Sequence, residues 1–270
     1  MPSEPQLDSF ISASIYATPV DVKKLKFIFS VIEEYAGAKN IKREALCILE
    51  VACGSGGITL PLASLGCQVR AFDINEEAVK FLKKNADDKF ENLTVTIDDG
   101  YTFNDEKLYD VIIVSEVLEH VLDPSKFIAN VSQRMAVGSY LVVTIPNGYG
   151  PWELKNRIDP RTYLKKWDWL RRLLGKPPYV KGDGADHCQF YTWGQLTTLL
   201  SSFSLRAIRF EKSDSLLAMF RPLRKSSLFG NIDIKLADIL PYWLASGWYS
   251  AFELEESNKL TETSPAISMP

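Results

Sequence analysis

The chain has 270 residues, of which 46% are hydrophobic and 24% are charged, and its formal net charge is -3. This length and apolar content suffice for one large α/β domain or two small ones. The slightly acidic balance argues against a general nucleic-acid binder, which carries a basic surface. The sequence shows neither a signal-peptide core at its start nor a run of about 18 apolar residues, so we expect a cytoplasmic protein.

The cysteines give little evidence of a special chemistry. There are four of them, Cys47, Cys53, Cys67 and Cys188, and no two form a Cys-x-x-Cys pair. Because zinc sites and redox pairs need such spacings, the simplest interpretation is four reduced thiols.

Residues 1–40 predict a loose arm followed by a helix. Apolar residues recur at helical spacing over 22–35, with Asp21 as a candidate N-cap and Gly37 as a candidate stop. We expect the main domain to begin after this helix, at about residue 41.

From residue 47 onward, strands and helices alternate. Strands are expected at 47–51, 68–72, 93–97, 109–114 and 140–145, and helices at 57–65, 76–85 and 124–134. Such alternation predicts parallel pairing in a doubly wound, Rossmann-like α/β sheet. The run 111–114 is apolar throughout, as in a central strand that is covered on both faces.

The pattern changes after residue 145. A helix at 193–203 and strands at 205–210 and 248–254 would complete a seven-stranded sheet in a domain that spans 41–254. Two insertions, at about 146–190 and 213–243, would interrupt it. Residues 255–270 are polar and predict a disordered tail.

The most informative segment is the turn after the first strand. It reads Glu50-Val51-Ala52-Cys53-Gly54-Ser55-Gly56-Gly57, and Asp73 follows at the end of the second strand. Glycines let the backbone approach a ligand closely, since they lack a Cβ. An acidic residue at the end of the second strand is placed to accept hydrogen bonds from a ribose.

This segment alone leaves several interpretations open. A dinucleotide-binding site typically has the motif G-x-G-x-x-G. The chain has a degenerate version of it, in which Ala52 replaces the first glycine and Gly54 and Gly57 are the other two. An NAD-dependent oxidoreductase is therefore one alternative. The glycines could also simply form a turn, with Asp73 as the N-cap of the helix at 76–85.

Four motifs in sequence resemble those of class I S-adenosylmethionine (SAM) methyltransferases. Glu50-x-Ala52-x-Gly54-x-Gly56 resembles their first motif, Asp73 their ribose-binding acid, and Asp99-Gly100 their acid after the third strand. The segment 109–124, with Leu118-Glu119-His120-Val121, resembles the fourth-strand motif of ubiquinone-biosynthesis-type O-methyltransferases. The resemblance is close over 45–150. The departure is Ala52, which replaces a glycine and is tolerated if its φ is negative.

The resemblance implies SAM as the cofactor. Asp73 would accept from the ribose, Ile74 would pack on the adenine, Asp99 or the adjacent Asp98 would bind the adenine amino group, and the Ser115 carbonyl would meet the ammonium. The full implied cofactor set is Glu50, Ala52, Cys53, Gly54, Gly56, Asp73, Ile74, Asp99, Gly100, Ser115 and Glu116.

The candidate catalytic residues are the two histidines, His120 and His187. A hydroxyl acceptor gains from a general base, and both rings are expected near the acceptor, although each could be structural instead. Glu116, Glu119, His120 and Asp123 could form a metal site on paper. Nothing in the sequence distinguishes this group from a solvated acidic loop, so no metal is predicted.

The acceptor is the least determined part of the prediction. Methyltransferases that act on nucleic-acid amino groups carry Asn/Asp-Pro-Pro-Tyr/Phe after the fourth strand, where this chain has 115–118 as Ser-Glu-Val-Leu, so nucleic acid is disfavoured. Tyr163, Leu164, Trp167, Leu170 and Leu174 share one face of a candidate helix, with basic residues opposite. That helix would be a lid, a peripheral contact with an anionic membrane, or a cradle for an acidic substrate.

The sequence thus predicts an enzyme that methylates a small-molecule or lipid-like acceptor, at oxygen, and releases S-adenosylhomocysteine. A SAM-binding regulatory protein without turnover is the non-enzyme alternative. The sequence does not determine the oligomeric state.

Overall fold

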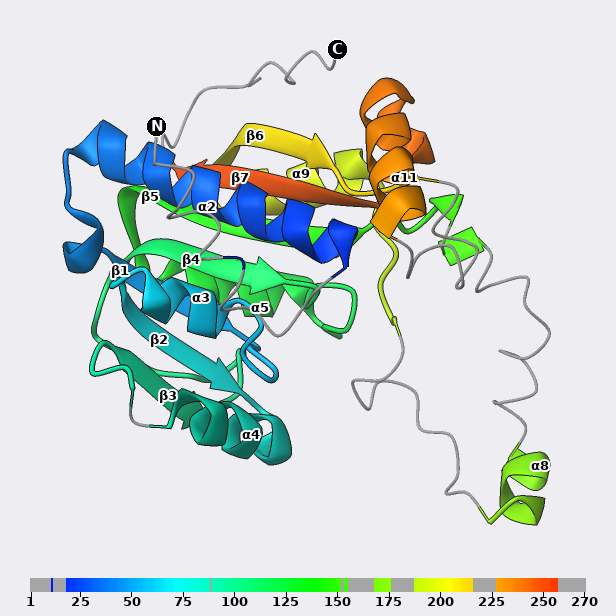
Figure 1. Ribbon diagram of the computed structural model, residues 1–270, viewed down its shortest axis with the longest axis horizontal. Helices are drawn as coiled ribbons and strands as arrows, with labels where there is room; N and C mark the ends of the chain where they lie inside the picture. The colour runs from blue at the N-terminus through cyan, green and yellow to red at the C-terminus, as the bar shows by residue number, and fades with distance from the viewer. Residues whose placement is uncertain are drawn as a thin grey trace.

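A seven-stranded sheet forms the centre of the computed structural model, which describes residues 11, 18–87, 89–151, 153–154, 168–175, 187–215 and 227–256. The strands are β1 (Cys47–Val51), β2 (Gln68–Asp73), β3 (Leu93–Ile97), β4 (Tyr109–Ser115), β5 (Met135–Pro146), β6 (Leu205–Lys212) and β7 (Gly247–Leu254). Their order is β3-β2-β1-β4-β5-β7-β6, and only β7 runs antiparallel to its neighbours (Figure 1). The predicted Rossmann-like sheet is confirmed.

Helices cover both faces of this sheet. They are α2 (Pro19–Lys39), α3 (Thr59–Ser64), α4 (Glu76–Ala86), α5 (Pro124–Ser132), α8 (Asp168–Leu173), α9 (Trp193–Ser201) and α11 (Ser227–Ile239), with short 3₁₀ turns at Arg43–Ala45 and Tyr242–Leu244. Helices α2, α3 and α4 lie on one face, and α5 and α9 lie on the other (Figure 1). The first five strands are therefore wrapped on both sides, as the alternating pattern predicted.

The central strand β4 explains how the two layers are held. Ile112 and Val114 belong to the cluster shared with α5, whereas Val111 and Ile113 belong to the cluster shared with α2. All four side chains are fully buried. Burial of each such side chain contributes about 1.5–3 kcal/mol, so β4 fixes the ends of the neighbouring strands firmly in place.

The first helix is longer than the sequence predicted. Its N-cap is Thr18, whose hydroxyl accepts from the backbone N–H of Asp21 at 3.3 Å, so the prediction of Asp21 as the cap was wrong. The helix also continues through Gly37 and ends at Asn40, which has the left-handed φ of 52°. Tertiary packing of the apolar face outweighs the weak helix propensity of one glycine.

Helix α11 lies in a segment for which only an irregular insertion was expected. The helix contains Gly230, a residue type with weak helix propensity. In the structure a Cβ at this glycine would lie 2.8 Å from Cγ of Pro19, at the start of α2. The glycine therefore permits the close approach of two helices.

The expected amphipathic helix is only partly described. Tyr163, Leu164 and Trp167, and the side chain of Leu170, lie outside the described residues. Helix α8 stands apart from the sheet in Figure 1, and Leu174 just after it is exposed. The part that the structure describes does not cover the sheet edge, and the lid stays a prediction.

Two expectations concern the chain ends and the thiols. Residues 257–270, most of the predicted tail, fall outside the described ranges. All four cysteines are free. Within the described ranges, every helix is too short or too polar to span a bilayer.

Candidate active site

The turn after β1 is a tight left-handed loop. Gly54 and Gly56 have φ values of 52° and 89°, which favour glycine. Ala52 has a φ of 57°, so the negative φ under which this turn would tolerate an alanine without strain is not met. A left-handed alanine costs about 1–2 kcal/mol, which the surrounding structure must offset. A Cβ at Gly56 would lie 2.2 Å from Cδ1 of Leu82, so α4 closes in on the loop.

Asp73 is anchored to this turn at the end of β2. Its Oδ2 accepts from the backbone N–H of Gly54 at 2.7 Å, and its Oδ1 accepts from that of Asn75 at 2.8 Å. The N-cap of α4 is Asn75, whose side chain accepts from Glu77 and Ala78. The interpretation of Asp73 as a helix cap was therefore wrong, and its carboxylate faces the turn instead.

Glu50 lies buried beneath the same turn. Its Oε2 accepts a 2.5 Å hydrogen bond from Oγ1 of Thr59, at the start of α3. Burial raises the pKa of Glu50 to about 8, against the opposing effects of the Thr59 hydrogen bond and the charge of Lys24. The adjoining Cys53 is also buried, which raises the pKa of its thiol and makes it unreactive.

The next group follows β2 and β3. Ile74 is 70% exposed, which is unusual for a large apolar side chain directly after a strand. Asp98 accepts hydrogen bonds from Arg70 and Thr96. Among the described residues, Asp99 accepts one side-chain hydrogen bond, from the backbone N–H of Tyr101 to Oδ1. Of the two adjacent acids, Asp98 is thus engaged on the protein and Asp99 has the freer carboxylate.

The end of β4 is tied to β5. The hydroxyl of Ser115 lies 2.8 Å from that of Thr144, and Thr144 also donates to Oε1 of Glu116 at 2.8 Å. Glu116 has a left-handed φ of 56° and is exposed. Its backbone turns the chain out of the sheet so that its side chain faces a pocket.

This pocket, of about 290 Å³, lies where the ends of β4 and β5 meet the start of α2. Its walls come from segments that are far apart in sequence: Val20, Asp21, Lys24, Glu116, Ile145, Pro146, His187, Ser213, Asp214, Ser246, Gly247 and Tyr249. Glu116 is the one residue that it shares with the cofactor set predicted from the sequence. It adjoins that group rather than coinciding with it.

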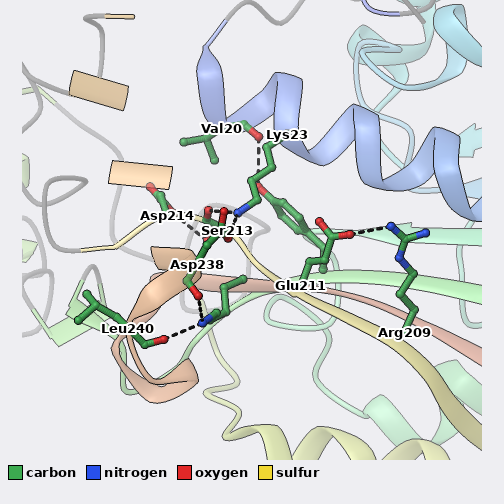
Figure 2. A network of polar contacts seen from close by, with 10 residues as sticks. Val20, Lys23, Arg209, Glu211, Ser213, Asp214, Asp238 and Leu240 are labelled. Carbon is green, nitrogen blue, oxygen red and sulfur yellow. Dashed lines mark hydrogen bonds and ion pairs between the residues drawn. The ribbon is translucent and has the colours of Figure 1, made fainter. Parts of the chain in front are cut away.

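A polar network holds one wall of the pocket (Figure 2). Lys23 of α2 donates to the Ser213 carbonyl at 3.3 Å and to Asp238 of α11 at 2.6 Å. Lys212 donates to the carbonyls of Asp238 and Leu240. These bonds tie α2, the end of β6 and α11 together, so the wall is built from three separate segments.

The two histidines lie next to each other, and His187 is one of the residues that line the pocket. Their ring centroids are 4.9 Å apart with the planes at 78°. Nδ1 of His187 lies 2.7 Å from a carboxylate oxygen of the buried Glu153, and Nε2 of His120 lies 3.9 Å from one of Glu119. Although they are distant in sequence, the structure brings both predicted catalytic residues together.

Glu119 is the buried centre of this group. Burial, and secondly the charge of Glu116, raise the pKa of its carboxyl well above the usual range. Its backbone carbonyl accepts from the N–H groups of Cys188 and Gln189 at 2.8 and 2.9 Å, which fixes the loop of His187 beside it. Asp123 has a structural role instead. Its Oδ1 accepts from the backbone N–H of Lys126 and so caps α5.

Sequence reasoning missed three residues around this site. Lys24 acts electrostatically on both Glu50 and Glu119, Glu153 lies beside the His187 ring, and Asp214 lines the pocket. Glu153 and Asp214 belong to the two insertions and Lys24 to the first helix, where no motif marks them.

Comparison with known proteins identifies the family. The profile of a family described as a methyltransferase domain matches residues 23–209. The chain belongs to this methyltransferase family. The family assignment made from the four motifs is confirmed, and the alternative of an NAD-dependent oxidoreductase has no support.

Curated relatives of this methyltransferase-family chain match over its central part. A ubiquinone biosynthesis O-methyltransferase of Rickettsia typhi is 37% identical over 105 residues, 38% of this chain and 42% of the relative. One of Caulobacter vibrioides is 30% identical over 119 residues, 41% of this chain and 45% of the relative. The chain therefore spans less than half the length of these relatives.

Solved structures share the fold over most of the chain. A putative sarcosine dimethylglycine methyltransferase of Galdieria sulphuraria has a TM-score of 0.54 at 16% identity, covering 91% of this chain and 93% of the other. Magnesium protoporphyrin IX methyltransferase of Synechocystis, with bound SAH, has a TM-score of 0.50 at 15% identity, covering 93% and 95%. At such identities the likeness shows the fold alone.

Proposed function

We propose that this protein transfers a methyl group from SAM to an oxygen of a small-molecule or lipid-like acceptor and releases S-adenosylhomocysteine. The observation that carries the proposal is the position of Asp73, anchored to the glycine turn at the carboxyl ends of β1 and β2. Ligands of open α/β sheets bind at that edge. The acceptor pocket adjoins it.

The cofactor would lie across the ends of β1 to β4. Asp73 would accept from the ribose hydroxyls, and the exposed Ile74 would pack on the adenine. Asp99 is favoured over Asp98 for the adenine amino group, since Asp98 already binds Arg70. The backbone of Gly54, Gly56, Gly100 and Ser115, with Ala52, Cys53, Glu50 and Glu116 around it, would complete the set.

Methyl transfer needs little covalent help from the protein. The bond from sulfur to the methyl carbon breaks as the bond from oxygen to that carbon forms, so in-line positioning supplies much of the rate. The acceptor must also lose its proton. We assign this task to His120 and His187, the catalytic pair, because His187 lines the pocket and His120 adjoins it.

The proposal that oxygen receives the methyl group rests on the site and on the relatives. An imidazole pair suits an acidic hydroxyl better than an amine that must already be neutral to react. The relatives' names describe O-methyltransferases. The pocket volume suits a small molecule or one end of a longer one.

A lipid-like acceptor would also agree with the segment around α8. Trp169 and Leu173 are exposed there, next to the basic Arg171 and Arg172. Apolar and basic residues together favour peripheral contact with anionic membranes. Flotation with anionic liposomes tests this: we expect co-flotation that Trp169→Ala weakens, and failure of the wild type to float would rule it out.

The central test is calorimetric titration with SAM, S-adenosylhomocysteine and NADH. We expect SAM and S-adenosylhomocysteine to bind and NADH not to bind. Asp73→Ala should abolish binding, and Asp99→Asn should weaken it more than the matched Asp98→Asn. Binding of NADH alone would overturn the proposal. SAM binding without methyl transfer to any phenolic or lipid acceptor would identify a regulatory protein instead.

A further inference from the structure

We propose that Arg70 is a positioning residue for the cofactor and gives the site its selectivity for the 6-amino group of adenine. The inference rests on the proposed function, in which Asp99 accepts a hydrogen bond from that amino group. Arg70 lies on β2 and acts through the loop 98–105, whose first and last residues it binds.

The guanidinium of Arg70 binds two carboxylates at once. Its Nη2 lies 3.1 Å from Oδ2 of Asp98, and its Nη1 binds Oδ2 of Asp105. A guanidinium is a planar fork with its donors at fixed angles, so binding two acids fixes their positions relative to each other. The two ends of the loop 98–105 are thereby held together.

Asp98 is the acid that this ion pair removes from competition for the ligand. Its Oδ2 accepts from Arg70 and also from Oγ1 of Thr96, at 2.7 Å. Two adjacent carboxylates without partners would repel each other and present two alternative acceptors. Since Arg70 neutralises Asp98, Asp99 is left as the acceptor for one neutral amino group.

The other end of the loop is anchored by further bonds. Asp105 accepts from the hydroxyl of Tyr109 on β4 and, through Oδ1, from the backbone N–H of Lys107 at 3.0 Å. Burial alone would raise the pKa of Asp105, but the hydrogen bonds that it accepts outweigh burial and lower the pKa. Asp105 therefore stays ionised at neutral pH, and its ion pair with Arg70 persists.

The part of the loop between these anchors is tightly bonded within itself. The carbonyl of Asp99 accepts from the backbone N–H groups of Thr102 and Phe103 at 2.9 and 2.7 Å. The side-chain amide of Asn130 on α5 donates to the carbonyls of Gly100 and Phe103 at 3.1 and 3.2 Å. A shift of either anchor would therefore move Asp99 together with the rest of the loop.

The loop begins beside the acid that would bind the ribose. The backbone N–H of Asp98 donates to the Asp73 carbonyl at 3.3 Å, which continues the pairing between β2 and β3. Asp99 thus lies one residue beyond a fixed point next to Asp73. Ribose and adenine are joined by one bond, so the two acids must keep this relation for a single ligand to reach both.

The bonding of Arg70 indicates a contribution to position more than to stability. Its side chain is 21% exposed, and among the residues that the structure describes its Nε is a buried atom without a hydrogen-bond partner. A buried donor without a partner costs free energy, and replacement of buried ion pairs by apolar residues is often neutral or stabilising. The ion pairs are better explained by the place that they give to the loop.

The test compares the affinity of S-adenosylhomocysteine with that of its analogue that carries hydrogen in place of the 6-amino group, both by calorimetry. We expect the wild type to prefer S-adenosylhomocysteine at least about 10-fold, since the analogue leaves the Asp99 carboxylate without its donor. Asp99→Ala should remove this preference. Arg70→Gln should reduce it to about 3-fold or less, because the loop is then held at neither end.

Arg134→Gln is the matched control, because Arg134 donates to Asn104 in the same loop rather than to either acid. It should keep the wild-type preference. If the role of Arg70 were merely structural, Arg70→Gln would weaken both ligands equally, and that result would overturn the proposal. If Arg70→Gln fails to fold, Arg70→Lys decides: an ammonium keeps the charge without the two-sided fork and should also lower the preference.

The same titrations separate the role of Arg70 from the proposed function. Failure of the wild type to bind S-adenosylhomocysteine would refute the cofactor itself. Equal affinities in the wild type, or an unchanged preference in Asp99→Ala, would show that Asp99 does not bind the amino group, and the role of Arg70 would be refuted with it. A preference that depends on Asp99 but not on Arg70 would refute the role of Arg70 alone.

Discussion

The proposed cofactor side and the proposed acceptor side of this site are built in different ways. The cofactor side comes from one continuous part of the chain, 50–116, in which each strand end contributes its group in turn. The acceptor side gathers α2, the end of β5, the start of β7 and segments beside the two insertions. A contiguous site leaves a motif in the sequence, whereas a gathered site does not.

Mutations on the acceptor side should lower kcat, whereas mutations on the cofactor side should lower SAM affinity. Since His187 lines the pocket and is not among the proposed cofactor ligands, His187→Gln should lower kcat by about 10²–10⁴-fold and leave SAM affinity unchanged. Steady-state kinetics with a methyl acceptor, next to a SAM titration, measure both. Asp73→Ala is the complementary variant and should abolish SAM binding. Loss of SAM affinity in His187→Gln would show that the two sides are one unit.

The cofactor side should also be disrupted by a substitution that overpacks the glycine turn. Gly56→Ala places a Cβ 2.2 Å from Cδ1 of Leu82 at a left-handed φ of 89°. Overpacking and backbone strain together should lower the free energy of unfolding by about 2–4 kcal/mol and weaken SAM binding.

Gly37→Ala is the control for that variant. Gly37 lies inside α2, and a Cβ there meets nothing within 4 Å. It should raise the free energy of unfolding by about 0.5–1 kcal/mol. Denaturant unfolding of both variants checks the pair, and equal destabilisation would contradict the packing argument.

Glu50 gives the cofactor side a pH dependence. Burial raises its pKa to about 8 in the folded protein, with Asp73 adding to the rise and Thr59 and Lys24 opposing it. The native state therefore holds a proton that the unfolded state has released between about pH 4.5 and 8. The free energy of unfolding should fall as pH rises through this window, by at most about 1.4 kcal/mol per pH unit.

Glu50→Gln should flatten that fall. The difference between wild type and variant isolates Glu50 from the other buried acids, and Glu77→Gln, an exposed site, is the matched control. Denaturant unfolding at several pH values between 5 and 8 measures it. An identical slope in wild type and Glu50→Gln would show that Glu50 is ionised throughout.

The difference between a site built from one continuous segment and a site gathered from distant segments also explains how much of the molecule the sequence could predict. The strands follow from apolar runs such as 111–114, which the structure buries completely, whereas the order of the strands in the sheet was not predicted. The meeting of His120 and His187 depends on two loops tied through the Glu119 carbonyl, and a sequence does not display such backbone bonds. Helix α11 was not predicted within the insertion at 213–243, and its close contact with α2 at Gly230 depends on a distant segment of the chain.

The turn at Ala52 gives the smallest expected effect. An alanine normally has a negative φ, whereas Ala52 has a left-handed φ of 57°. Ala52→Gly removes strain of about 1–2 kcal/mol and adds about 0.5–1 kcal/mol of chain entropy lost on folding. The variant should thus be more stable by about 0.5–1 kcal/mol. Ala78→Gly, inside α4, is the control and should be less stable by a similar amount. Denaturant midpoints that move in the same direction would mean that Ala52 is unstrained, and the alanine would then have another function at the ligand.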